Sequence, residues 1–245
     1  MRYIASALRS KTLALGPRVA ISAAIASSVA LGPSQAAVPQ TAEEYRQQGL
    51  SYRNQGRFDE AIAALEQSVA LAPDHQGGQV ILGWTQHLAG QQEPAARTLT
   101  QAVYRNPFDI PTLNALGIVH LVQGNLGQAV TSHLWAAHLQ SDNEVAYFNL
   151  SLAAQRLTLY DWAIATAARA AELEPYNPHP LIAEAIALWS QDKLEDAQQR
   201  YREALDLSPR YGTPDLDFYL EQAAFSPEQI AIAYEIVETL TGESL

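Results

Sequence analysis

His120 and His133 are the side chains whose type and spacing come closest to a chemical site in this sequence. Neutral imidazole is a common metal ligand, so the pair could begin a metal site and a metal-dependent enzyme could be built around it. Such a site needs further ligands, but the sequence has no cysteine and places no carboxylate near this pair. We interpret the pair as two hydrogen-bonded core histidines and expect no metal or cofactor.

Other patterns that carry chemistry do not occur. The sequence contains no H-E-x-x-H, no G-x-S-x-G, no phosphate-binding glycine loop and no dinucleotide fingerprint. Its carboxylates are expected on solvated helix faces, with no pair meeting in a pocket. The sequence therefore predicts a protein that is not an enzyme, and a metal-dependent enzyme centred on the histidine pair is the third of three hypotheses.

The elements that would position these side chains repeat along the chain at a constant spacing. Alanine recurs at this spacing as Ala61, Ala95, Ala129, Ala163 and Ala197. Each period also has a small residue early in its first half and another late in its second half. Small side chains let two helices cross closely, because the crossing distance depends on the residues at the contact. The period therefore predicts a stack of similar helix pairs.

The repeated residues of the first unit are Tyr45, Gly49, Tyr52, Gly56, Phe58, Ala61, Leu65, Ser68, Leu71 and Pro73. They resemble the tetratricopeptide repeat, a helix–turn–helix unit whose length equals the alanine spacing. The resemblance implies an all-α, right-handed α-solenoid with units at 42–75, 76–109, 110–143, 144–177 and 178–211. We expect 212–245 to be a degenerate sixth repeat or C-terminal cap, in which the alanine series continues to Ala231. Thr158 and Asp192 depart from the pattern by replacing turn glycines.

The segment at 1–36 is typical of a removable export signal. Basic residues without any acidic residue precede an uncharged run at 19–32, and small residues surround Ala36. This run is shorter than the roughly 20 residues that span a bilayer. We expect cleavage after Ala36, a linker at 37–41, and a mature chain in the periplasm, outside the cell, or in an organelle or thylakoid lumen. An uncleaved anchor and a transit peptide are the alternatives.

The chain is acidic, with a formal net charge of -11. This charge repels phosphate backbones and anionic lipid, so neither nucleic acid nor a lipid surface is expected as a partner. Membrane contact would come only through an uncleaved N-terminus or a membrane-protein partner. Residues 110–141 differ because they contain no Asp, Glu, Lys or Arg. Either a second copy of the chain or a membrane protein covers them, or their Gln, Asn, Ser and Thr form a neutral surface.

The resemblance implies that the first helices of the units line a concave, mostly apolar groove. Such a groove favours a partner protein or peptide with an apolar or amphipathic segment. Arg46 and Arg53 are its only charged residues, which argues against a clamp for an acidic peptide end. The expected lining residues are Arg46, Leu50, Arg53, Val80, Trp84, His87, Asn114, Ile118, Leu121, Phe148, Leu152, Gln155, Ile182, Ile186 and Trp189.

The four tryptophans lie outside the regular core positions of the repeat. Trp84 and Trp189 fall in the expected groove, whereas Trp135 and Trp162 fall at second-helix positions that the resemblance implies are charged and solvated. Because tryptophan is enriched among interface anchors, Trp135 and Trp162 are candidates for a second binding surface. Burial by local shifts in packing is the alternative.

The sequence thus predicts an exported binding module, an adaptor or assembly factor, with Trp84, Ile118, Phe148 and Trp189 as groove anchors. A self-associating scaffold built on the uncharged third unit is the second hypothesis. Whether the last helix, at 230–240, lies in the groove and closes it stays open at this point.

Overall fold

The computed structural model describes residues 41–242, so the predicted signal at 1–36 and most of the linker lie outside the described residues. Within 41–242 the chain is all-α and has no strand, which confirms the predicted fold class. The helices are α1 (Ala42–Asn54), α2 (Phe58–Leu71), α3 (Gln76–Leu88), α4 (Gln92–Arg105), α5 (Ile110–Val122), α6 (Leu126–Leu139), α7 (Glu144–Arg156), α8 (Tyr160–Leu173), α9 (Pro178–Trp189), α10 (Leu194–Leu207), a 3-10 turn (Pro209–Gly212), α11 (Leu216–Gln222) and α12 (Pro227–Thr241).

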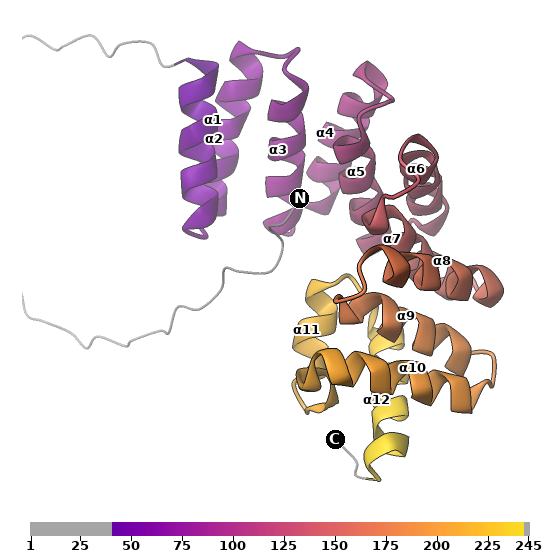
Figure 1. The fold of residues 1–245 in the computed structure, drawn as a ribbon. Coiled ribbons are helices and arrows are strands. Elements are labelled where there is room, and N and C mark those ends of the chain that lie inside the picture. The colour runs from indigo at the N-terminus through magenta and orange to yellow at the C-terminus, as the bar shows by residue number, and fades with distance from the viewer. Residues whose placement is uncertain (1–40, 243–245) are drawn as a thin grey trace, which may run out of the picture.

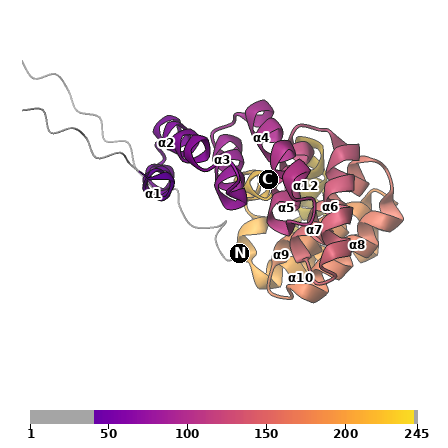
Figure 2. The ribbon, with the colours of Figure 1, turned by 90° about the horizontal axis from the view of Figure 1, so that it is seen from above.

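The helices stack in pairs, and each predicted unit from 42–75 to 178–211 contains one pair. From α1 to α10 each helix packs against the next, and α3, α5, α7 and α9 also contact one another in turn. The result is a curved array with α1 and α2 at one end and α11 and α12 at the other (Figures 1 and 2). No helix within 41–242 has both the length and the apolar character to cross a membrane.

In each of the first two units, a match of side-chain sizes lets the two helices cross closely. A Cβ atom on Gly49 would lie 2.6 Å from Cγ of Leu65, and one on Gly83 would lie 2.6 Å from Cγ of Leu99. Interiors are too densely packed to absorb such overlaps cheaply, so these positions need glycine. The second-helix residues at this repeat position are all completely buried: Leu65, Leu99, His133, Ala167 and Tyr201.

The turn inside each unit needs a left-handed backbone at one position. Gly56, Gly90 and Gly124 have φ values of 73°, 76° and 78° there. Thr158 and Asp192 occupy the same position in the fourth and fifth units and keep the conformation, with φ values of 61° and 59°. A β-branched residue is strained in this region because its Cβ crowds the backbone. The packing of the flanking helices therefore determines the turn, even where glycine is missing.

Side-chain caps fix the start of the first and the last helix. Thr41 and Glu44 form a capping box at α1, and Ser226 with Gln229 forms one at α12. Gly242 ends α12 with a left-handed cap at φ 70°. The two ends of the described array are thus defined by local interactions as well as by packing.

The largest apolar core lies at the C-terminal end of the array. It joins α9 and α10 to the cap and extends to Leu121 of the third unit. On α12 the buried apolar side chains are Ile230, Ala233, Ile236 and Val237, whereas Ala231 is exposed. Ala231 therefore does not form the close crossing of the other alanines, and α12 packs with a different face from the second helices.

Candidate functional site

The first helices present three rows of side chains at repeat positions, and these rows contain the predicted groove residues. One row runs through Leu50, Trp84, Ile118, Leu152 and Ile186, whose environments change along the array. Leu50, Trp84 and Ile118 are partly exposed, whereas Leu152 is 1% and Ile186 0% exposed. The row of predicted groove residues is therefore partly exposed at units one to three and buried at units four and five.

The cover is α12, together with the turn that precedes it. Gln229 is 1% exposed, and its side-chain amide donates hydrogen bonds to the Leu152 carbonyl oxygen at 3.2 Å and to Oε1 of Gln155 at 3.0 Å. The ring of Phe225 lies 5.8 Å from the ring of Phe148. Helix α12 and the preceding turn thus cover the predicted groove residues of units four and five.

This arrangement corrects the predicted anchors at the C-terminal end of the groove. Trp189 donates from Nε1 to Oε2 of Glu235 on α12 at 3.0 Å, and Phe148 packs against the same core. Ile182 is completely buried, as is Leu121. Phe148, Ile182 and Trp189 belong to the core that joins units four and five to the cap, so the chain itself supplies the apolar contacts that we expected from another protein.

The predicted groove residues of the second unit include one aromatic pair, Trp84 and His87. Trp84 packs against the core of the second and third units, and its ring lies 4.8 Å from the ring of His87. His87 contacts Oε1 of Gln92 through Nδ1 at 2.7 Å, and burial lowers its pKa. Val80 is partly exposed beside them in sequence. His87 is therefore neutral near pH 7 and adds no charge to this pair.

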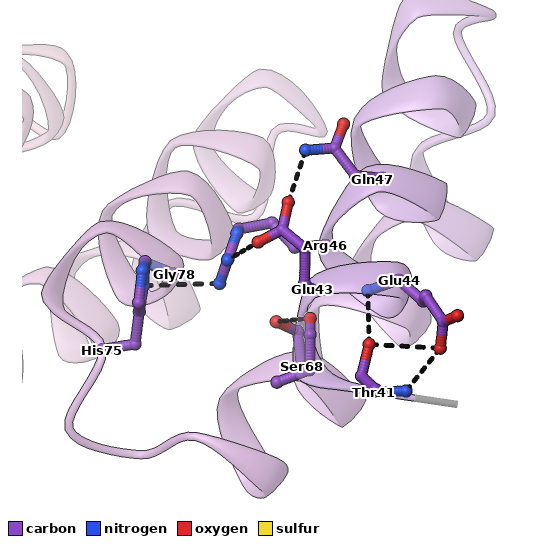
Figure 3. A network of polar contacts seen from close by, with 9 residues as sticks. Thr41, Glu43, Glu44, Arg46, Gln47, Ser68, His75 and Gly78 are labelled. Atoms are coloured by element: carbon purple, nitrogen blue, oxygen red, sulfur yellow. Dashed lines mark hydrogen bonds and ion pairs between the residues drawn. The ribbon is translucent and has the colours of Figure 1, made fainter. Parts of the chain in front are cut away.

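Two polar residues of the predicted groove are already satisfied within the chain. Asn114 exchanges two hydrogen bonds of 3.2 Å with Asn143. Arg46 forms an ion pair with Glu43, and its Nη1 lies 3.4 Å from Nδ1 of His75, as Figure 3 shows. His75 in turn accepts a hydrogen bond from the backbone N–H of Gly78 at 2.9 Å. Arg46 is therefore held at the end of the array and is not a free cation in the groove.

Arg53 differs from Arg46 because its guanidinium has no hydrogen bond or ion pair in the described part of the chain. Partial burial lowers its pKa, and no neighbouring carboxylate opposes this effect. A cation that loses hydration without gaining a partner is costly. Arg53 is thus a partly desolvated and unpaired positive charge among the predicted groove residues of the first unit.

The two tryptophans assigned to a second surface lie in different surroundings. Trp135 is 39% exposed, its ring lies 6.2 Å from the ring of Phe108, and its Nε1 donates to the carbonyl oxygen of Pro107 at 2.7 Å. Phe108 is 64% exposed. Trp162 instead packs against the small buried residues Ala154 and Ala163. Trp135 belongs to an exposed aromatic patch, whereas Trp162 is a packing residue.

The histidine pair lies inside the third unit, but His133 does not form the hydrogen bonds that we expected of a core histidine. His133 is completely buried against Gly117, and neither of its ring nitrogens has a hydrogen-bond partner in the described chain. Nδ1 of His120 is also buried without a partner. Burial lowers the pKa of His133 to about 3, so it packs as a neutral ring. No group of three or more potential metal ligands occurs within 41–242.

The expectation that no carboxylates meet in a pocket is also wrong. Glu184 and Glu203 both contact Arg200, and all three line a cleft between α8, α9 and α10. A signal for this cluster exists in the sequence. The repeat position of Glu184 is leucine in the three preceding units, at Leu82, Leu116 and Leu150. A carboxylate at a leucine position of the core marks a place where the chain departs from the repeat.

Comparison with known proteins agrees with this fold. Residues 42–75 match the family model described as tetratricopeptide repeat. A search of curated proteins finds no significant match. Among solved structures, a crystal structure of MamA is 20% identical with a TM-score of 0.61, covering 66% of this chain and 95% of that chain. TTC0263, a thermophilic TPR protein of Thermus thermophilus, is 24% identical with a TM-score of 0.57, covering 75% of this chain and 98% of that chain.

A third similar structure is MamA 41-end from Desulfovibrio magneticus RS-1, which is 16% identical with a TM-score of 0.64. The match covers 69% of this chain and 96% of that chain. At such low identities the likeness concerns the fold alone. The family match of the first unit and the shared fold of the array together support a tetratricopeptide repeat solenoid.

Proposed function

We propose that the chain is an exported protein-binding module, an adaptor or assembly factor, that binds its partner in the open part of the groove at units one to three. The observation that carries this proposal is the row of partly exposed apolar side chains at Leu50, Trp84 and Ile118. At units four and five α12 covers the same row, which indicates the kind of ligand that suits this surface. An amphipathic helix or an apolar peptide fits it best.

Arg53 adds a charge requirement to this partner. Its guanidinium is partly desolvated and has no partner in the described chain. A carboxylate on the bound segment would supply charge-assisted hydrogen bonds at this point. We infer that the partner presents an acidic residue beside its apolar face.

Export is the second part of the proposal and rests on the sequence of residues 1–36. A basic start, an uncharged run and small residues at Ala36 support a cleaved signal. Mass spectrometry of the chain recovered from its native compartment tests this. An N-terminus at or near Ala37 is the expected result, and an intact Met1 in the exported fraction would contradict it.

Two substitutions in the groove test partner binding. The partner is first isolated by affinity capture from the native compartment, and its affinity is then measured for each variant. Trp84→Asp removes the aromatic floor and should abolish binding. Arg53→Gln should weaken binding about tenfold, as expected for one charge-assisted hydrogen bond.

Arg57→Gln is the matched control for Arg53→Gln. Arg57 lies in the same unit but is exposed and pairs with Glu60. The Arg57→Gln substitution should leave the affinity for the partner unchanged. Circular dichroism should show the same helicity in Trp84→Asp, Arg53→Gln and Arg57→Gln. Equal affinities of the folded Trp84→Asp variant and the unchanged chain would reject the groove as the binding site.

Self-association is a second candidate function, favoured by the exposed aromatic patch. Trp135 and Leu134 are exposed on the uncharged third unit, with Leu134 44% exposed, and Phe108 is exposed at the end of the second unit. An acidic chain meets least repulsion from its own copies at an uncharged face. Light scattering over a range of concentrations tests this candidate. A dimer that Trp135→Glu dissociates would support it, and a monomer at high concentration would exclude it.

A further inference from the structure

The fifth unit replaces two residues of the repeat together. Glu184 stands at the position of Leu82, Leu116 and Leu150, and Arg200 stands at the position of Ala64, Thr98, Ser132 and Thr166. The two side chains contact each other, with Arg200 Nε donating to Oε1 of Glu184 at 3.0 Å. An apolar contact with a small neighbour has thus become a partly buried ion pair. Such a pair is weak evidence for added stability, because desolvation offsets its Coulomb attraction.

One carboxylate oxygen of this ion pair has no hydrogen-bond donor within the described part of the chain. Glu184 is 4% exposed, and its Oε2 is buried without any hydrogen-bond donor among residues 41–242. Burial raises the pKa of this carboxyl group, and the opposing effect of Arg200 offsets this rise only in part. A buried carboxylate oxygen without a donor costs the free energy of its lost hydration. Oε2 of Glu184 could therefore accept one further hydrogen bond.

Oε2 belongs to a side chain that lines an open cleft. The cleft has a volume of about 490 Å³ and lies between α8, α9 and α10. Glu184 is two residues from both Ile182 and Ile186, so it projects from the side of α9 opposite to the groove. Figure 1 shows α8, α9 and α10 next to one another at this end of the array. A molecule in the cleft would thus not compete with one in the groove.

The cleft is strongly acidic at its walls and aliphatic between them. Glu172, Glu184, Glu203 and Asp206 face a single base, Arg200. Arg200 is already occupied by Glu184 and by Oε2 of Glu203, the latter at 2.8 Å. Glu172 pairs with Arg169 at 2.8 Å. The remaining lining residues are Ala168, Ala171, Pro175, Asn177, Leu181 and Leu207.

This chemistry fits an organic cation with an alkyl stem. No three carboxylate or imidazole groups within 41–242 are arranged to hold a metal ion, so a bare ion does not match. A guanidinium offers planar paired donors to carboxylates and is weakly hydrated, so it enters such a site more readily than an ammonium. Leu181 and Leu207 would contact the methylene groups of the stem.

We propose that the cleft between α8, α9 and α10 binds an alkylguanidinium group, which donates to the free Oε2 of Glu184 and to Asp206. The group is either the side chain of an arginine in a partner or a free small molecule. This inference does not depend on the proposed function of the groove, because the two sites lie on different sides of α9.

The test is a titration of the purified isotope-labelled chain, followed by NMR shifts at the cleft. L-argininamide is the free ligand, and a capped Gly-Gly-Arg-Gly-Gly peptide represents a side chain in a partner. Citrullinamide is the control of similar shape without a charge, and lysinamide is the control that carries an ammonium group in place of the guanidinium. We expect saturable shifts confined to α8, α9 and α10 with the arginine probes, and affinities about tenfold weaker for citrullinamide. A preference for the peptide would assign the ligand to a partner, and equal binding would assign it to the guanidinium alone.

The variant Glu184→Leu/Arg200→Thr removes the site and restores the residues of the fourth unit, Leu150 and Thr166. It should fold with unchanged helicity and lose binding. Asp206→Asn leaves the buried pair intact and should weaken binding several-fold, while Asp59→Asn at the other end of the array should have no effect. Three results would overturn the proposal: no shifts with either arginine probe, undiminished affinity in the folded double variant, or lysinamide binding as tightly as L-argininamide.

Discussion

Units one to three and units four to five follow the same sequence period, but they are covered differently. In the first group the groove-facing row at Leu50, Trp84 and Ile118 is partly exposed, whereas α12 buries Leu152 and Ile186 in the second. The apolar cores of the first group are small, and one large core joins the second group to the cap. A repeat pattern therefore determines the shape of a unit but not its environment.

This difference has a consequence for local stability. In an array each unit contacts only its neighbours, so stability is approximately a sum over units and their interfaces. Units four and five gain an additional interface with α12, which units one to three lack. We expect the N-terminal end to open at lower free energy than the C-terminal end. Four changes test or sharpen this contrast.

The largest effect is expected when α12 is removed by ending the chain after Ala224. This exposes the buried side chains Leu152, Ile182 and Ile186 and deprives Gln155 of the Gln229 hydrogen bond. Units four and five should lose cooperative unfolding and bind a hydrophobic dye, while units one and two keep their helicity. Cooperative unfolding that persists unchanged would show that α12 is not part of that core.

The second change compares one repeat position at the two ends. Ile186→Ala should cost about 2–5 kcal/mol, since a completely buried side chain leaves a cavity. Leu50→Ala at the same repeat position should cost less, because Leu50 is partly exposed. Urea unfolding of both variants gives the two values. Equal losses would mean that the two ends are covered alike.

The third change concerns the buried ring in the third unit. The pKa of His133 is about 3 in the folded chain and near 6.5 in the unfolded chain, so the unfolded state binds the proton more tightly. Stability should therefore fall as the pH drops from 6.5 towards 3, by up to about 1.4 kcal/mol per pH unit from this residue. No contribution from it is expected above pH 6.5.

His133→Leu provides the comparison, because Leu65 and Leu99 fill this position in the first two units. The variant should unfold with a shallower dependence on pH in that window and with similar stability at pH 7. Unfolding free energies measured from pH 4 to pH 7 decide the matter. Parallel curves for the two proteins would rule out His133 as the source of acid sensitivity.

The smallest effect is expected at the turns. Thr158→Gly relieves a β-branched residue at φ 61° and should stabilise the fold by about 0.5–1 kcal/mol. Gly90→Ala places a side chain in the same conformation in the second unit and should destabilise by a similar amount. Thermal unfolding of the two variants should therefore move in opposite directions, and a loss of stability in Thr158→Gly would refute the strain.

Much of the fold follows from residues that act within one unit. Gly49 and Leu65 must match in size, and Thr41 and Glu44 cap a helix. Both interactions join residues that lie close together in the sequence, so they can be predicted from it. The place of α12 does not follow in this way. Ala231 continues the alanine series but is exposed, because the apolar face of α12 contains Ile230, Ala233 and Val237. Which face of a last helix is buried depends on contacts far along the chain.

The candidate sites show the same limit. Trp84 and Arg53 are partly exposed, and their place in the groove stays a prediction that rests on their repeat positions alone. Phe148 and Trp189 were assigned to a partner because the Phe225 and Glu235 contacts join distant segments. The cleft at Glu184 needs both the departure from leucine and the matching change at Arg200, and their contact becomes evident only when α9 and α10 are packed together.

The size match between Gly49 and Leu65, and again between Gly83 and Leu99, lies entirely inside a unit. A whole unit can therefore be copied or deleted without breaking this size match. Gln229 ties the last helix to α7, so such changes of length are open only before the fourth unit. The number of units at the N-terminal end can therefore change, in evolution or by engineering, while the packing of α12 on units four and five stays the same.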